Sequence, residues 1–111
     1  EVTRGSTELR QLLSQAGVKL VVVDWFAPWC GPCRAIKPKY EELASRHRDC
    51  LFCSVDCEAT GENKALMMDA GIRAFPTFHL YAGSRRVHES SGADAAKLET
   101  AINTHKASAA P

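Results

Sequence analysis

Cys30 and Cys33, separated by two residues, are the side chains of this 111-residue sequence whose types and spacing most clearly allow chemistry. Their sulfur atoms can reach each other across one turn of chain, so the pair can alternate between a dithiol and a disulfide. Such a pair can serve as a redox centre, as part of a metal site, or as a static cross-link. The neighbouring residues and the predicted elements distinguish these three uses.

The predicted surroundings of the pair favour redox chemistry. The almost continuous apolar run Lys19–Phe26 predicts a central strand, and a helix is expected to begin within the cysteine motif that follows it. Backbone N–H groups and the helix dipole at that N-terminus would stabilise a thiolate on Cys30. Cys33 lies one turn later and can attack the Cys30 sulfur, which releases a reduced target from a mixed disulfide. Pro32 suits the first turn of the helix, and Gly31 lets a partner approach closely.

The remaining cysteines make the metal and cross-link interpretations weaker. A structural zinc needs four ligands, but Cys50 and Cys53 stand three apart on a predicted strand and should point to opposite faces. We therefore expect no metal. A static disulfide across so short a loop gains little closure entropy. The odd total of five cysteines argues against a disulfide framework and indicates a reducing compartment, so we expect a cytoplasmic protein.

Strands and helices alternate along the chain and would place the motif at the edge of a sheet. After a helix around Leu9–Ala16, ended by Gly17, and the central strand, we expect these elements: a helix from the motif to His47, kinked at Pro38, a strand Leu51–Asp56, a helix Glu62–Ala70, a hairpin of Thr77–Tyr81 and Arg85–Glu89, and a helix Asp94–His105. This order predicts an α/β fold, with a central mixed sheet of four to five strands flanked by helices on both faces. Its reactive crevice should lie at the carboxyl ends of the parallel strands. Residues 1–105 form one domain, and residues 106–111 are expected to be a flexible tail.

Composition excludes some classes of partner. The 14 basic and 13 acidic residues nearly balance, which gives no indication of a nucleic-acid or anionic-membrane partner. The longest uninterrupted apolar run, Leu20–Val23, is too short for a membrane span or a signal-peptide core. We expect a monomer with neither nucleic acid nor membrane as a partner.

Several segments resemble the thioredoxin family. Val21–Arg34 resembles the family's strand and active-site stretch, and Pro38 matches its helix-kinking proline. Ala74–Phe78 resembles its cis-proline loop, and Ser91–Ala93 its final glycine loop. The similarity extends over residues 5–105. It implies the thioredoxin fold and a protein-disulfide reductase that serves cell redox homeostasis. It also implies disulfide-containing protein substrates and no bound cofactor, with electrons supplied by an NADPH-dependent thioredoxin reductase.

The resemblance also assigns roles to individual residues. Cys30 would be the nucleophile and Cys33 the resolving cysteine, and the two would form the redox-active disulfide. Asp24 would be a buried carboxyl group that acts as general base for Cys33, with a pKa raised by burial; the plainer alternative is a strand-end residue exposed to water. An apolar substrate-binding patch around Cys30 would consist of Trp29, Gly31, Pro32, Phe75, Pro76 and Gly92, with a cis bond before Pro76.

Three positions depart from the common family pattern or fall outside it. Phe75 is bulkier than the usual aliphatic residue and would reshape the substrate patch. Ser54 stands where many members carry a lysine near the buried carboxyl group, so Asp24 should titrate higher. Cys57 follows the second strand on the active-site side. It is either a small buried hydrophobe or a regulatory thiol, open to glutathione or a second disulfide.

Two other functions compete with a general reductase. Segments Cys57–Gly71 and Gly92–Glu99 resemble the N-terminal domain of thioredoxin-like protein 1, a family that appends a proteasome-binding domain. In that interpretation the domain stays redox-active, but an attached domain or partner complex sets its targets. Oxidases and isomerases of the secretory pathway are a further alternative. They usually carry histidine at the position of Pro32, so the Gly-Pro dipeptide favours the reducing end of the family.

Overall fold

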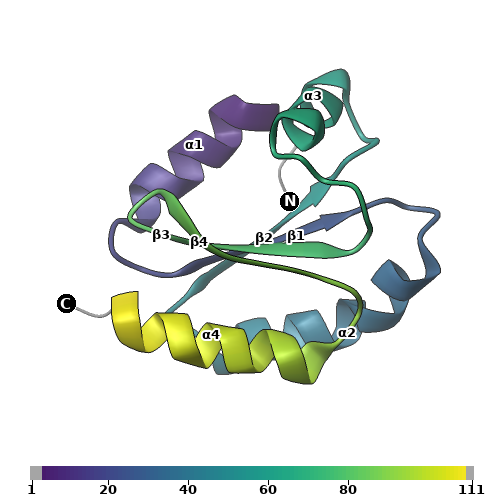
Figure 1. Ribbon diagram of the computed structural model, residues 1–111. Coiled ribbons are helices and arrows are strands. Elements are labelled where there is room, and N and C mark those ends of the chain that lie inside the picture. Colours follow the sequence, from purple (N-terminus) through teal and green to yellow (C-terminus); the bar gives the residue numbers. More distant parts are fainter. Residues whose placement is uncertain (1–3, 110–111) are drawn as a thin grey trace.

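The fold places one mixed sheet between two pairs of helices (Figure 1). The computed structural model describes residues 4–109. Its elements are α1 (Gly5–Ala16), β1 (Val21–Phe26), α2 (Gly31–Arg46), β2 (Leu51–Asp56), α3 (Gly61–Asp69), β3 (Thr77–Ala82), β4 (Arg85–Ser91) and α4 (Ala95–Ala109). The strand order is β2-β1-β3-β4, in which β1 and β2 run parallel and the other pairs antiparallel. The four strands of the described residues confirm the predicted mixed sheet.

Alternation along β1 assigns each side chain to one of two cores. Val21, Val23 and Trp25 pack toward α1 and α3, whereas Leu20 and Val22 pack toward α2 and α4. Because successive strand residues point to opposite faces, Asp24 belongs to the α2 face. Both faces of β1 are covered, which explains why this strand reads as a continuous apolar run.

The same alternation separates two cysteines. Cys50 packs into the core under α2 and α4, and Cys53 packs against the core under α1 and α3. The prediction that they face opposite ways is confirmed. Among the described residues, no cluster of three or more His, Cys, Asp or Glu side chains could hold a metal ion.

The predicted boundaries agree with the structure to within two residues, except at the start of α1, which begins at Gly5 and not near Leu9, and at the end of α4. That helix continues to Ala109 instead of ending at His105, so residues 106–109 of the expected tail are helical. Residues 110–111 lie outside the described part of the chain, and the domain boundary at residue 105 stays a prediction. None of the helices in residues 4–109 is long and apolar enough to cross a membrane.

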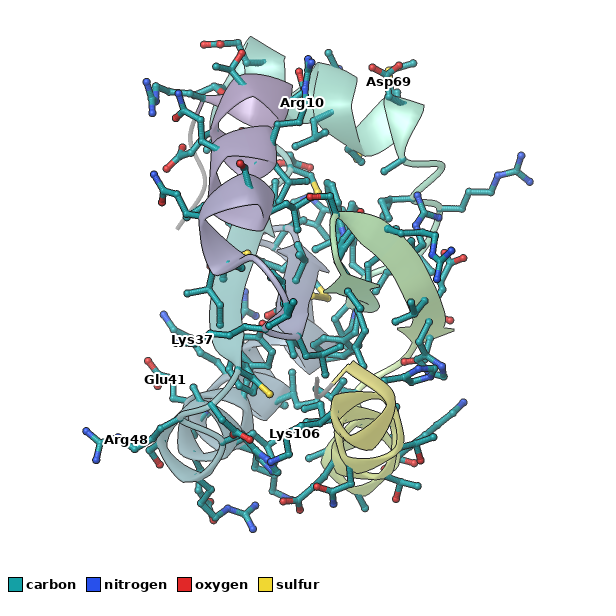
Figure 2. All side chains as sticks on the ribbon, turned by 90° about the vertical axis from the view of Figure 1, so that its left-hand side faces the viewer. Arg10, Lys37, Glu41, Arg48, Asp69 and Lys106 are labelled. Atoms are coloured by element: carbon teal, nitrogen blue, oxygen red, sulfur yellow. A yellow bond between two sulfur atoms is a disulfide. The ribbon has the colours of Figure 1, made fainter. Side chains whose placement is uncertain are left out.

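Polar contacts at the end opposite the cysteine motif explain the longer helix. Lys106 lies at the seam between α2 and α4 (Figure 2), where its ammonium group contacts His47 Nδ1 at 2.9 Å and Asp49 at 3.3 Å. His47 Nε2 contacts the Glu99 carboxylate at 2.9 Å. We call these four residues the α2–α4 brace. It ties the last turns of α4 to the end of α2, which local sequence patterns do not reveal.

Candidate active site: a cysteine pair at a helix N-terminus

Cys30 and Cys33 are joined as a disulfide at the start of α2, with their Cα atoms 5.3 Å apart. Cys30 is the N-cap residue, and its sulfur accepts a hydrogen bond from the Cys33 N–H at 3.2 Å. Gly31 and Pro32 occupy the first helical positions. Proline suits such a position because the N–H that it lacks would have no partner within the helix. The prediction that the helix begins within the motif is confirmed. When the pair is reduced, the backbone N–H groups of this helix N-terminus and the helix dipole favour negative charge on Cys30.

Asp24 is a buried carboxyl group behind this pair. Only 6% of the residue is exposed, and burial raises its pKa from the ordinary 3.8 to about 7. Its Oδ1 atom has no hydrogen-bond partner among the described residues. Asp24 and Cys33 both line a cavity of about 440 Å³ bounded by β1, β2 and α2. The alternative of an exposed strand-end residue is therefore wrong, and a group able to exchange protons near neutral pH lines the same cavity as Cys33.

Ser54 lies next to Asp24, as the sequence predicted. The two residues are direct register partners on β2 and β1, and both line the cavity. A hydroxyl group brings no positive charge, and burial is the cause of the raised pKa of Asp24.

Trp29 and Phe75 form an aromatic platform beside the disulfide. Trp29 is 62% exposed, and its indole meets the Phe75 ring edge to face, with ring centroids 5.8 Å apart. Phe75 also packs against the cysteine pair. The Phe75–Pro76 bond is cis, as predicted, and the Pro76 carbonyl accepts a hydrogen bond from the Gly92 N–H at 2.9 Å. The structure thus brings the expected patch residues from three separate segments to one edge of the sheet.

Two residues that support this platform escaped the sequence analysis. Glu58 accepts a hydrogen bond from the Trp29 indole N–H. Arg34 donates one from Nη1 to the Pro28 carbonyl at 2.7 Å. The sequence position of Glu58 could have indicated this contact, because Glu58 closely follows the carboxyl end of β2, at the edge of the sheet where the cysteine motif lies. Nothing local indicated the contact of Arg34.

Cys57 is a fully buried member of the core under α1 and α3. Burial raises the pKa of its thiol to about 12, so little reactive thiolate forms at neutral pH. These observations fit the simpler of the two interpretations of Cys57, that of a small buried hydrophobic residue. A regulatory role stays a prediction, and it requires the covering segment to open.

Comparison with known proteins agrees with this geometry. Residues 3–104 match the family model described as Thioredoxin. The chain is 42% identical over 100 residues to thioredoxin-1 of Schizosaccharomyces pombe, which covers 90% of this chain and 92% of that protein. The X-ray structure of Fasciola hepatica thioredoxin matches with a TM-score of 0.88 at 36% identity, covering 93% of this chain and 96% of that one. A chain from the crystal structure of a ferredoxin:thioredoxin reductase and thioredoxin f2 complex matches with a TM-score of 0.85 at 36% identity, covering 91% and 90%.

Sequence, fold and the cysteine pair lead to the same conclusion. The family match spans nearly all of the described chain and includes the motif at the start of α2. The structural matches reproduce the sheet and its flanking helices. This chain therefore belongs to the thioredoxin family and is a thiol-disulfide oxidoreductase of the protein-disulfide reductase type.

Proposed function

We propose that Cys30 attacks the disulfides of target proteins, that Cys33 resolves the intermediate, and that Asp24 is the general base for Cys33. The observation that carries this assignment is the placement of the Cys30–Cys33 disulfide at the N-terminus of α2, with Asp24 in the cavity that Cys33 lines. The helix N-terminus favours a thiolate on the first cysteine, and the buried carboxyl group serves the second.

The reaction transfers two electrons from the dithiol to the target. The Cys30 thiolate attacks one sulfur of the target disulfide, the target S–S bond breaks, and the released target thiolate takes up a proton. Asp24 then accepts the Cys33 proton, and the Cys33 thiolate attacks the Cys30 sulfur. The mixed disulfide breaks, the second target sulfur leaves as a thiolate that takes up a proton, and the enzyme disulfide forms. A carboxyl group with a pKa of about 7 can accept and return that proton at neutral pH.

Target binding is assigned to the patch of Trp29, Gly31, Pro32, Phe75, Pro76 and Gly92. The exposed indole and the Phe75 ring offer apolar area beside the attacked bond. The backbone of the cis-proline loop can pair with an extended target segment. The bulk of Phe75 favours targets with small or flat side chains next to their cysteine.

A separate reductase would return the protein to the dithiol state. We expect no cofactor on this chain and electrons from an NADPH-dependent thioredoxin reductase. The solved complex of a thioredoxin f2 with ferredoxin:thioredoxin reductase supports reductase docking on a chain of this shape. We further propose a monomer that works in the cytoplasm. The match to thioredoxin-1, of which 92% is covered, supports a general reductase.

Insulin reduction tests the assignment. Wild type, Cys30→Ser and Cys50→Ala are compared with NADPH and thioredoxin reductase, and again with dithiothreitol as electron donor. We expect turnover by wild type and by Cys50→Ala, whose cysteine lies in the core, and none by Cys30→Ser. Activity with dithiothreitol but not with NADPH would refute only the reductase assignment. Equal activity of Cys30→Ser and wild type in both arms would refute the nucleophile. Cys33→Ser should accumulate mixed disulfides, which mass spectrometry identifies.

A further inference from the structure

We propose that Arg34 is a positioning residue for target binding, because its guanidinium group holds the Pro28–Trp29 peptide and so fixes the Trp29 indole beside Cys30. This inference rests on the proposed role of Trp29 in binding targets.

The first step is the geometry of the loop between β1 and α2. The Cys30 N–H donates to the Ala27 carbonyl at 3.1 Å, which closes a turn with Pro28 and Trp29 at its centre. The Pro28 carbonyl and the Trp29 N–H belong to the same planar peptide group. Because Arg34 Nη1 donates to that carbonyl at 2.7 Å, it restrains the plane from which the Trp29 side chain departs.

The second step is that Trp29 needs such restraints. The residue is 62% exposed, so little buried area holds its side chain in one rotamer. Three contacts replace packing: the Arg34 bond to its peptide, the Glu58 carboxylate on its indole N–H, and the edge of the Phe75 ring. A platform that is ordered before the target arrives saves the entropy of ordering it on binding.

The third step is the position of Arg34 itself. It lies at the start of α2, where the positive end of the helix dipole disfavours a cation, and the first turn carries no acidic residue. Its side chain is exposed and is free to extend into water. Instead it reaches back over the turn to make a short, charge-assisted hydrogen bond, which is stronger than one between neutral groups.

Lys39 offers a matched control. It is an exposed cation five residues further along α2, and it is not among the residues that line the cavity of Asp24 and Cys33. The structure shows no hydrogen bond from Lys39 to the Pro28–Trp29 peptide among the described residues. Arg34→Met and Lys39→Met therefore both remove one positive charge from α2, but only Arg34→Met removes the tether.

Steady-state kinetics with insulin and NMR relaxation of the Trp29 indole N–H test the proposal. Losing one charge-assisted bond that orders the platform should raise KM about fivefold in Arg34→Met, with kcat within about twofold of wild type. The indole order parameter should fall. Arg34→Lys, which keeps the charge and one donor, should lie between wild type and Arg34→Met. Lys39→Met should match wild type in both measurements.

Two results would overturn the proposal. One is an unchanged KM and an unchanged indole order parameter in Arg34→Met. The other is an equal rise of KM in Arg34→Met and Lys39→Met, which would assign the effect to charge alone. Thermal unfolding of each variant separates a general loss of stability from a local effect on Trp29. The NMR arm needs no turnover, so wild type that fails to reduce insulin while its indole stays tethered would refute the proposed function and not the tether.

Discussion

Replacing Asp24 with asparagine is expected to stabilise the protein at neutral pH. The residue is 6% exposed, and burial raises the pKa of its carboxyl group from 3.8 to about 7. Each pKa unit corresponds to about 1.4 kcal/mol, so keeping this group protonated in the fold costs about 4 kcal/mol at pH 7. An amide of the same shape carries no charge, although its buried N–H groups forfeit part of the gain. We expect the free energy of unfolding to rise by about 2–4 kcal/mol.

The gain must depend on pH in one direction. Below pH 3.8 the carboxyl group is protonated in both the folded and the unfolded chain, so wild type carries no penalty. Between pH 3.8 and about 7 the unfolded chain ionises while the folded protein stays protonated, and the stability of wild type falls as pH rises. Above this window both states are ionised and the penalty is constant. The advantage of Asp24→Asn should therefore be small near pH 4 and full above pH 7.

Urea denaturation of wild type and Asp24→Asn from pH 4 to pH 8 measures this difference, because the other titrating groups cancel between the two proteins. Asp69→Asn, which changes an exposed carboxylate on α3, is the control. An advantage that stays constant from pH 4 to pH 8 would contradict the reasoning. So would an Asp24→Asn protein no more stable at pH 7 than Asp69→Asn.

Ser54→Lys extends the same test to the neighbour of Asp24. A lysine at this register partner places a cation beside the carboxyl group and should lower its pKa. The alkylation rate of Cys33 should then reach its midpoint at lower pH than in wild type. The stabilisation by Asp24→Asn should also shrink in the Ser54→Lys background. Identical pH profiles of Cys33 alkylation in wild type and Ser54→Lys would contradict the idea that a cation at this position lowers the pKa of Asp24.

Three further outcomes are expected. Asn63→Ala should cost about 2–3 kcal/mol in urea denaturation, because a buried amide loses its bonds to the α1 N-terminus and to the end of β2. Exposed Asn103→Ala should cost nothing measurable. Burial lowers the pKa of His79 below its ordinary 6.5, so the free energy of unfolding should fall as pH drops below 6.5, where the unfolded chain takes up the proton first. In the same urea denaturation assay, His79→Gln should flatten this part of the profile. Iodoacetamide followed by mass spectrometry should label Cys57 at least about 100-fold more slowly than Cys30 in the reduced protein; comparable rates would show that Cys57 is accessible.

The parts of this fold that could be predicted are those that local chemistry controls. The run Lys19–Phe26 predicted a strand covered on both faces, and β1 is the buried strand between β2 and β3. Helix entry at the cysteine motif followed from Gly31 and Pro32, whose backbone properties suit a first turn. The burial of Asp24 was implied by the resemblance to the thioredoxin family, and the apolar run alone left an exposed strand end as an alternative.

The rest depended on contacts between residues far apart in sequence. The end of α4 was misplaced because Lys106 is held by His47 and Asp49, which no pattern around residue 106 reveals. The partner of the Trp29 indole, Glu58, comes from the end of another strand. Cys57 could be placed on the active-site side, but its complete burial depends on how α3 covers it.

The proline inside α2 has a mechanical consequence. Pro38 has no N–H, so the Arg34 carbonyl one turn earlier lacks its helical donor, and the hydrogen-bond ladder is interrupted there. On one side of this gap lies the turn that carries Cys30 and Cys33; on the other lies the α2–α4 brace. Small displacements that accompany opening and closing of the disulfide can be absorbed at the gap. The second half of α2 stays fixed to α4 by the brace. Movement is therefore confined to the first turn of α2, which carries the cysteine pair that contacts other proteins.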